Sequence, residues 1–161
     1  MIRKLALALS LVFGASAAQA QDAGLQEANY LTASPELYVV MFRADWCPPC
    51  KVVEPAIDTA LRSLSDPSIE YVEIDISHPS LSELSAHRAF DRDIVAQYNR
   101  WLGLTGFAAI VDATNKQTLG CVNMMYDAQS MATHIRNLKT YAVADQSSFD
   151  LTCPEPNNPV G

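Results

Sequence analysis

Two cysteines separated by two prolines are the residues of this chain with the clearest capacity for chemistry. Cys47 and Cys50 enclose Pro48 and Pro49 and directly follow Trp46. A C-x-x-C pair holds two thiols within reach of each other, so that a thiolate at one can attack a disulfide and the other can release the product. We therefore predict thiol–disulfide exchange in which Cys47 attacks and Cys50 resolves the mixed disulfide.

The residues on either side of the pair predict a strand that leads into a helix. Residues 37–42 form a continuous apolar run, which is typical of a buried strand. An apolar stripe predicts a helix over about 48–64, whose first turn tolerates prolines because its N–H groups have no partner there. The partial positive charge of a helix N-terminus favours a thiolate at Cys47.

The rest of the chain predicts an α/β domain with a mixed sheet. Beyond the first helix we expect one strand, two helices, a hairpin whose strands pair antiparallel, and a last helix capped by Asp127. Their expected ranges are 69–76, 80–89, 91–102, 107–111 with 118–124, and 128 to about 141.

The other two cysteines stand apart from the first pair. Cys121 falls in the second predicted hairpin strand, and Cys153 falls in a tail of residues 146–161 that is rich in Ser, Pro and Asn. We expect a structural disulfide between them that pins the tail to the sheet and stabilises the fold by roughly 2 to 4 kcal/mol. The alternative is two unpaired cysteines, which an oxidising compartment disfavours.

The start of the chain has the features of a secretory signal peptide. Arg3 and Lys4 precede a short apolar run, and Ala18 and Ala20 give the small residues that precede a cleavage site. The apolar run is about half the roughly 20 residues that span a bilayer, which disfavours the alternative of an uncleaved anchor. We therefore expect residues 1–20 to be removed after Ala20, one domain over 21–145, and a periplasmic location.

The charge of the chain disfavours some partners. The chain has 11 basic and 18 acidic residues, and removal of Arg3 and Lys4 would leave 9 basic residues and a formal charge of −9. Because phosphate groups and anionic headgroups repel such a chain, we expect neither nucleic acid nor an anionic membrane as a partner.

A lone C-x-x-C pair also occurs in proteins without redox activity. It can be half of a zinc site, a structural disulfide or two core cysteines. Zinc usually takes four ligands, and His78, His87 and His134 show no ligand spacing with the cysteines. We therefore expect no bound metal and no cofactor.

The segment from Val39 to Lys51 resembles the active-site segment of thioredoxin, including the tryptophan before the first cysteine and the lysine after the second. Pro55 matches the kinking proline of that family's active-site helix, and residues 103–112 resemble its Gly-x-x-Gly-x-Pro-Thr segment and the following strand. The resemblance implies a thioredoxin fold, with a central mixed β-sheet flanked by helices, and protein-disulfide oxidoreductase activity.

Two departures from the family concern the active site. Ala108 stands where the family has a cis-proline, and a cis bond before another residue costs about 2.5 to 4 kcal/mol. We therefore predict a trans bond between Phe107 and Ala108 and a remodelled substrate-binding loop. Met41 stands where the family has a buried acid that accepts the proton of the resolving cysteine. Asp45, Glu54 or water are the alternatives.

A third departure is the length of one connection. Thirty residues, 76–105, separate Asp75 from Gly106, which predicts a helical insertion between the central strand and the hairpin. Trp101 and Phe107 fall near the active-site edge, where they either recognise a partner or belong to the core.

The resemblance leaves the direction of electron flow open. Cys-x-Pro-Cys sites resemble those of reductases, including envelope thioredoxins that take electrons from a membrane donor. We therefore expect a monomer that reduces protein disulfides in the cell envelope. Arg43 would favour a thiolate and make the pair more oxidising. The alternatives are a disulfide donor or isomerase, a metal or iron–sulfur binding module, and a noncatalytic adaptor.

Overall fold

The structure, a computed structural model, describes residues 34–144 and 153–155. The predicted signal peptide and most of the predicted tail lie outside the described residues. The elements in chain order are β1 (Leu37–Arg43), α1 (Cys50–Leu64), β2 (Ile69–Asp75), α2 (Pro79–Asp91), α3 (Val95–Trp101), β3 (Phe107–Asp112), β4 (Thr118–Asn123) and α4 (Ala128–Val143).

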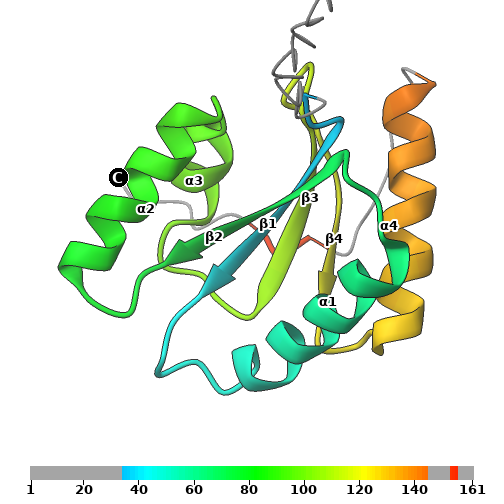
Figure 1. The fold of residues 1–161 in the computed structure, drawn as a ribbon. Coiled ribbons are helices and arrows are strands. Elements are labelled where there is room, and N and C mark those ends of the chain that lie inside the picture. The colour runs from blue at the N-terminus through cyan, green and yellow to red at the C-terminus, as the bar shows by residue number, and fades with distance from the viewer. Residues whose placement is uncertain (1–33, 145–152, 156–161) are drawn as a thin grey trace, which may run out of the picture. The chain divides into compact units, whose positions relative to one another are not determined.

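The four described strands form one mixed sheet in the order β2-β1-β3-β4 (Figure 1). β1 pairs parallel with β2 and antiparallel with β3, and β3 pairs antiparallel with β4. The predicted mixed sheet and antiparallel hairpin are confirmed. Together with the helices that flank the sheet, this arrangement is the thioredoxin fold that the resemblance implied.

β1 is buried on both faces because it lies between two strands and two layers of helices. Its odd-numbered residues, such as Met41, pack with α1 and α4, whereas even-numbered residues such as Phe42 pack with α2 and α3. This two-sided burial explains the continuous apolar run, because successive side chains of a strand point to opposite faces.

Helices α2 and α3 fill the predicted insertion, but α3 begins later than expected. The interval from Arg92 to Ile94 is a turn in which Asp93 has a φ of 55°, and its N–H donates to the carbonyl of Phe90. This left-handed residue interrupts the predicted helix over 91–102. No helix in the described part of the chain is both long and apolar enough to cross a bilayer.

α4 begins where the sequence predicted. The Asp127 side chain accepts a hydrogen bond from the backbone N–H of Ser130 at 2.7 Å, as an N-cap does. That hydrogen bond lowers the pKa of the Asp127 carboxyl below its ordinary value.

Candidate active site

Cys47 and Cys50 form a disulfide at the N-terminus of α1, with their Cα atoms 5.4 Å apart. The backbone N–H of Cys50 donates to the sulfur of Cys47 at 3.1 Å. N–H groups in the first turn have no partner within the helix and carry partial positive charge. In the reduced pair the same donor stabilises a negative charge on Cys47, which is the electrostatic arrangement that the sequence predicted.

Both cysteines are almost fully buried, whereas their neighbours in the loop are not. Cys47 is 2% exposed and Cys50 is 1% exposed, but the preceding Trp46 is 60% exposed. Pro48 is also exposed and Pro49 is half-buried. A partner that reaches the sulfurs therefore meets the ring of Trp46 at the surface.

Gly106 lies directly against the disulfide, in a position that only a residue without a side chain fills comfortably. A Cβ atom there would lie 2.8 Å from the Cβ of Pro49 and 3.4 Å from the sulfur of Cys47, and its φ is 92°. The N–H of Gly106 donates to the carbonyl of Phe42 at 2.9 Å. Sequence reasoning did not include Gly106 in the site, although its place in a Gly-x-x-Gly segment was a signal.

Phe107 and Ala108 begin β3 beside the cysteines. Phe107 pairs with Phe42 of β1 and Asn123 of β4, and Ala108 is fully buried between the same strands. No peptide bond among the described residues is cis. The predicted trans bond between Phe107 and Ala108 is confirmed.

Phe107 and Trp101 are core residues. The ring of Phe107 stacks on Phe42 at 5.0 Å between centroids, and Trp101 meets both rings edge-on. Trp101 is 1% exposed, and its indole N–H donates to the carbonyl of Pro154 at 3.0 Å. The core alternative is confirmed for both aromatic residues, which pack on the face of the sheet opposite the one that holds the cysteines.

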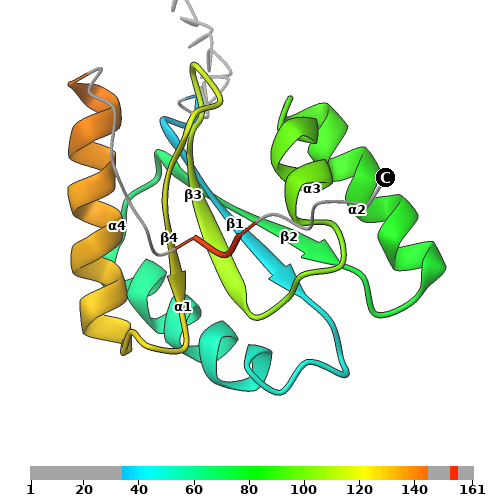
Figure 2. The same ribbon diagram turned by 180° about the vertical axis from the view of Figure 1, so that it is seen from behind.

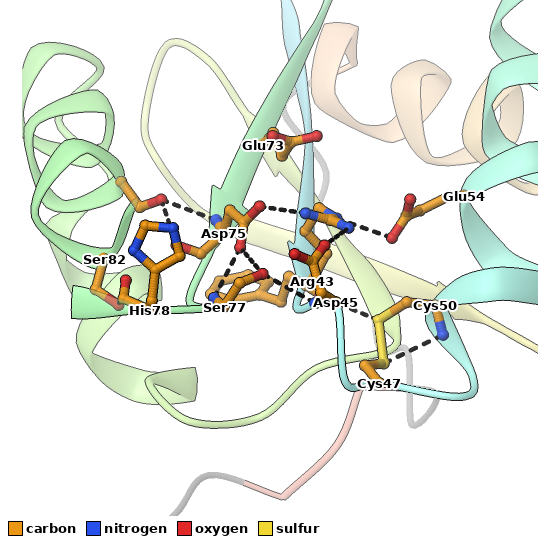
Figure 3. Close-up of polar contacts among 12 residues, drawn as sticks. Arg43, Asp45, Cys47, Cys50, Glu54, Glu73, Asp75, Ser77, His78 and Ser82 are labelled. Atoms are coloured by element: carbon orange, nitrogen blue, oxygen red, sulfur yellow. Dashed lines mark hydrogen bonds and ion pairs between the residues drawn. A yellow bond between two sulfur atoms is a disulfide. The ribbon is translucent and has the colours of Figure 1, made fainter. Parts of the chain in front are cut away.

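Arg43, at the end of β1, binds three carboxylates beside the disulfide (Figure 3). Its guanidinium pairs with Asp45 at 2.8 Å, with Glu54 at 3.0 Å and with Asp75. Burial opposes the charge on the guanidinium, but the hydrogen bonds to Glu54 and Asp45 raise the pKa of Arg43 above its ordinary value. We expected Arg43 to favour a thiolate at Cys47. The positive charge of Arg43 is instead paired with three carboxylates, so it gives no physical basis for that expectation.

Asp75 connects this network to the loop that carries the cysteines. Burial raises the pKa of Asp75, but hydrogen bonds from Ser77 and Arg43 outweigh it and hold that pKa below its ordinary value. The N–H of Asp45 donates to the hydroxyl of Ser77 at 2.9 Å, and the N–H of Ser77 donates to the Asp75 carboxylate at 2.8 Å. The loop before Cys47 is therefore fixed to the end of β2. Sequence reasoning missed both Asp75 and Ser77.

The second pair of cysteines, Cys121 and Cys153, is also joined by a disulfide, with Cα atoms 4.8 Å apart. Figure 2 shows the segment 153–155 crossing the sheet beside β4, on the face that α2 and α3 cover in part. Cys121 is fully buried, and Cys153 packs against the same core as Trp101. The described residues contain no free cysteine.

No metal site accompanies the cysteines in the described part of the chain. No group of three or more His, Cys, Asp or Glu side chains there is arranged to hold a metal ion. Of the three histidines, His78 precedes α2 and contacts Ser80, and His134 stacks on Tyr126.

The fold and the disulfide together define a thioredoxin-fold domain with a Cys-x-x-Cys pair at the start of a helix. Residues 22–86, which include both cysteines, match the family model described as Thioredoxin. Thioredoxin H2 of Arabidopsis thaliana is 38% identical over 48 residues, which are 30% of this chain and 35% of that protein. The chain therefore spans about a third of the length of the curated relative it matches.

Two solved structures illustrate the structural similarity. A thiol:disulfide interchange protein of the thioredoxin family from Chlorobium tepidum TLS matches 65% of this chain and 80% of its own, at 17% identity and a TM-score of 0.45. Thioredoxin from Fasciola hepatica matches 68% of this chain and 83% of its own, at 19% identity and a TM-score of 0.40.

Proposed function

We propose that the chain is a thiol–disulfide oxidoreductase that works by dithiol–disulfide exchange at Cys47 and Cys50. The observation that carries this proposal is the N–H of Cys50, which donates to the sulfur of Cys47 at the start of α1. In the reduced enzyme the Cys47 thiolate attacks a substrate disulfide, and one substrate thiolate leaves. Cys50 then attacks Cys47 and displaces the second substrate thiolate, which regenerates the Cys47–Cys50 disulfide.

The charge near the pair supports reduction of substrates as the direction. One guanidinium, that of Arg43, is surrounded by the carboxylates of Asp45, Glu54 and Asp75, so these groups together are negative. A negative environment opposes a thiolate, and a less stabilised thiolate makes a pair a weaker oxidant. The substrates would be disulfides of other proteins, and the electrons would come from a membrane donor.

Export to the periplasm is the second part of the proposal. The basic start, the apolar run and Ala18 and Ala20 support cleavage after residue 20. The Cys121–Cys153 disulfide adds support, because such bridges persist in oxidising compartments. The mass of protein recovered from the periplasm should correspond to a monomer that begins at Gln21. Recovery of the full-length chain from the cytoplasm would contradict this.

Equilibration of the Cys47–Cys50 pair with glutathione tests the direction. We expect a reduction potential near that of thioredoxin, about −270 mV, whereas a value near about −120 mV would identify a disulfide donor. Reduction of insulin tests the activity itself, and Cys47→Ser should lower its rate to that of the uncatalysed reaction. An unchanged rate would favour a noncatalytic adaptor, and metal that copurifies in proportion to the protein would favour a metal-binding module.

A further inference from the structure

The resolving step requires that the Cys50 thiol lose its proton inside the protein. Cys50 is 1% exposed, and its sulfur lies 4.0 Å from the carbonyl oxygen of Phe42. A carbonyl accepts a hydrogen bond but does not take the proton. Met41, which faces the same core as the cysteines, has no acidic group. The proton acceptor must therefore be another side chain or water.

We propose that Glu54, held in place by Arg43, accepts the proton of Cys50 during resolution. This inference rests on the proposed function. Glu54 lies four residues after Cys50 on α1, and residues at this spacing are neighbours on one face of a helix. Side chains on a helix also lean toward its N-terminus, so that of Glu54 leans toward the turn that holds Cys50.

Arg43 fixes the position of the Glu54 carboxylate beside the disulfide. The Nε of Arg43 donates to Glu54 at 3.0 Å, and Figure 3 shows Arg43 and Glu54 pointing toward each other above Cys50. Asp45, the other acid that the sequence offered, is held by the same guanidinium, but its side chain is 73% exposed and it precedes the helix. The Glu54 side chain is 34% exposed, which shields it in part and still lets it pass a proton to water.

The charge balance of the network allows Glu54 to take up a proton. Arg43 keeps two carboxylates, those of Asp45 and Asp75, when Glu54 becomes neutral. Protonation of Glu54 therefore leaves the guanidinium paired. The titratable or charged groups that face Glu54 or share its helix face are Arg43 from β1, Tyr71, Glu73 and Asp75 from β2, Asp45 from the loop, and Lys51 and Asp58 from α1.

In the resolving step one disulfide bond is exchanged for another and one proton leaves Cys50. The Cys50 proton moves to the Glu54 carboxylate, and the Cys50 sulfur forms a bond to the Cys47 sulfur. The bond between Cys47 and the substrate sulfur breaks, and the substrate leaves as a thiolate that takes a proton from water. Glu54 returns its proton to solvent, so that the substrate disulfide gains two electrons and the cysteine pair loses two.

The test measures the two phases in which the reduced protein releases thionitrobenzoate from Ellman's reagent. The first release reports attack by Cys47, and the second reports resolution by Cys50. Glu54→Gln keeps an oxygen that can accept from Arg43 but removes the basic carboxylate. We expect this substitution to slow the second phase at least about tenfold at pH 7. The slowing should be smaller than the largest known rate effects of general acid–base catalysis, because some of the Cys50 thiol ionises without a base. The first phase should change little.

The pH profile separates proton transfer from a structural role of Glu54. With Gln at position 54 the second phase should accelerate about tenfold per pH unit below the ordinary thiol pKa of about 8.5, as the thiolate fraction does. In the native protein the rate of the second phase should depend less steeply on pH. Glu54→Asp keeps a carboxylate and should restore part of that native rate and pH dependence. Asp58→Asn removes an equal charge one turn further along α1 and is the matched control.

The outcomes distinguish this inference from the proposed function. Two phases in Glu54→Gln with the native rates, or an equal slowing in Asp58→Asn, would overturn the role of Glu54 and leave disulfide exchange intact. A greater slowing in Asp45→Asn would assign the proton to Asp45 and overturn it as well. A native protein whose release of thionitrobenzoate is unchanged by Cys50→Ala would instead refute the proposed function.

Discussion

The two disulfides of this chain occupy contrasting surroundings. Cys47 and Cys50 are three residues apart and lie beside a charged network, that of Arg43 and its three carboxylates. Cys121 and Cys153 are 32 residues apart and lie in an apolar core with Trp101. The first disulfide joins residues that are already close in the chain at the start of α1, whereas the second joins β4 to the distant segment of residues 153–155.

This difference in spacing and surroundings separates a disulfide suited to exchange from one suited to stability. A short loop loses little chain entropy when it closes, so opening the Cys47–Cys50 bond destabilises the fold less. Polar groups around that pair can move protons and charge, whereas the apolar packing around Cys121 offers neither. The two pairs should therefore respond differently to substitution and to pH.

Replacement of each pair by alanine should give the largest contrast in stability. The double change Cys121→Ala and Cys153→Ala should lower the free energy of unfolding by about 2 to 4 kcal/mol, because the unfolded chain regains the freedom of a long loop. Cys47→Ala with Cys50→Ala should cost less, since its loop is much shorter. Urea unfolding of the oxidised proteins measures both. An equal loss in the two variants would refute the structural role of the second bridge.

The two regions also differ in how far sequence alone predicted them. Local patterns sufficed for β1, for a helix that begins at the cysteines, for the hairpin and for the Asp127 cap, because each depends on residues close in the chain. The pairing of Arg43 with Asp75 depends on the parallel register of β1 and β2, in which these two residues are partners. Composition and spacing do not specify a register between distant strands.

Gly106 shows the same limit at the site itself. Its contact with Pro49 and Cys47 joins residues more than fifty positions apart in the chain, and no local pattern encodes it. From the sequence we predicted that Arg43, which lies three residues before Trp46, favours a thiolate at Cys47. Its place in the sequence gave no sign of the carboxylates that surround its guanidinium.

Gly106→Ala should disturb the first disulfide and leave the second intact. The new Cβ would approach Pro49 at 2.8 Å and would force a side chain onto a φ of 92°. We expect a loss of about 1 to 3 kcal/mol in unfolding free energy, together with a changed Cys47–Cys50 reduction potential. Gly103→Ala is the control, because Gly103 has a similar φ of 90° and so shares the backbone strain. Equal potentials in the two variants would mean that the contact with Pro49 and Cys47 has no effect on the pair.

A fall in pH should destabilise the charged network of Arg43 before it destabilises the apolar core around Cys121. We expect this effect to be smaller than those of the cysteine and glycine substitutions. The folded protein lowers the pKa of Asp75, so the stability it contributes is present above the unfolded carboxyl pKa of about 3.9 and is lost as pH falls through the lower folded value. Hydrogen exchange at pH 5 and at pH 2.5, corrected for intrinsic rates, measures this. The amides of Asp45 and Ser77, which depend on Asp75, should lose protection by a small factor.

The indole N–H of Trp101 is the internal reference for that experiment. It donates to the carbonyl of Pro154 beside the Cys121–Cys153 disulfide, and Trp101 packs among apolar residues such as Phe42 and Phe107. Its protection should therefore stay constant while that of Asp45 and Ser77 falls. A parallel loss at all three sites would show that acid unfolds the sheet as one unit, and that the charged network does not set the stability of the active-site loop separately.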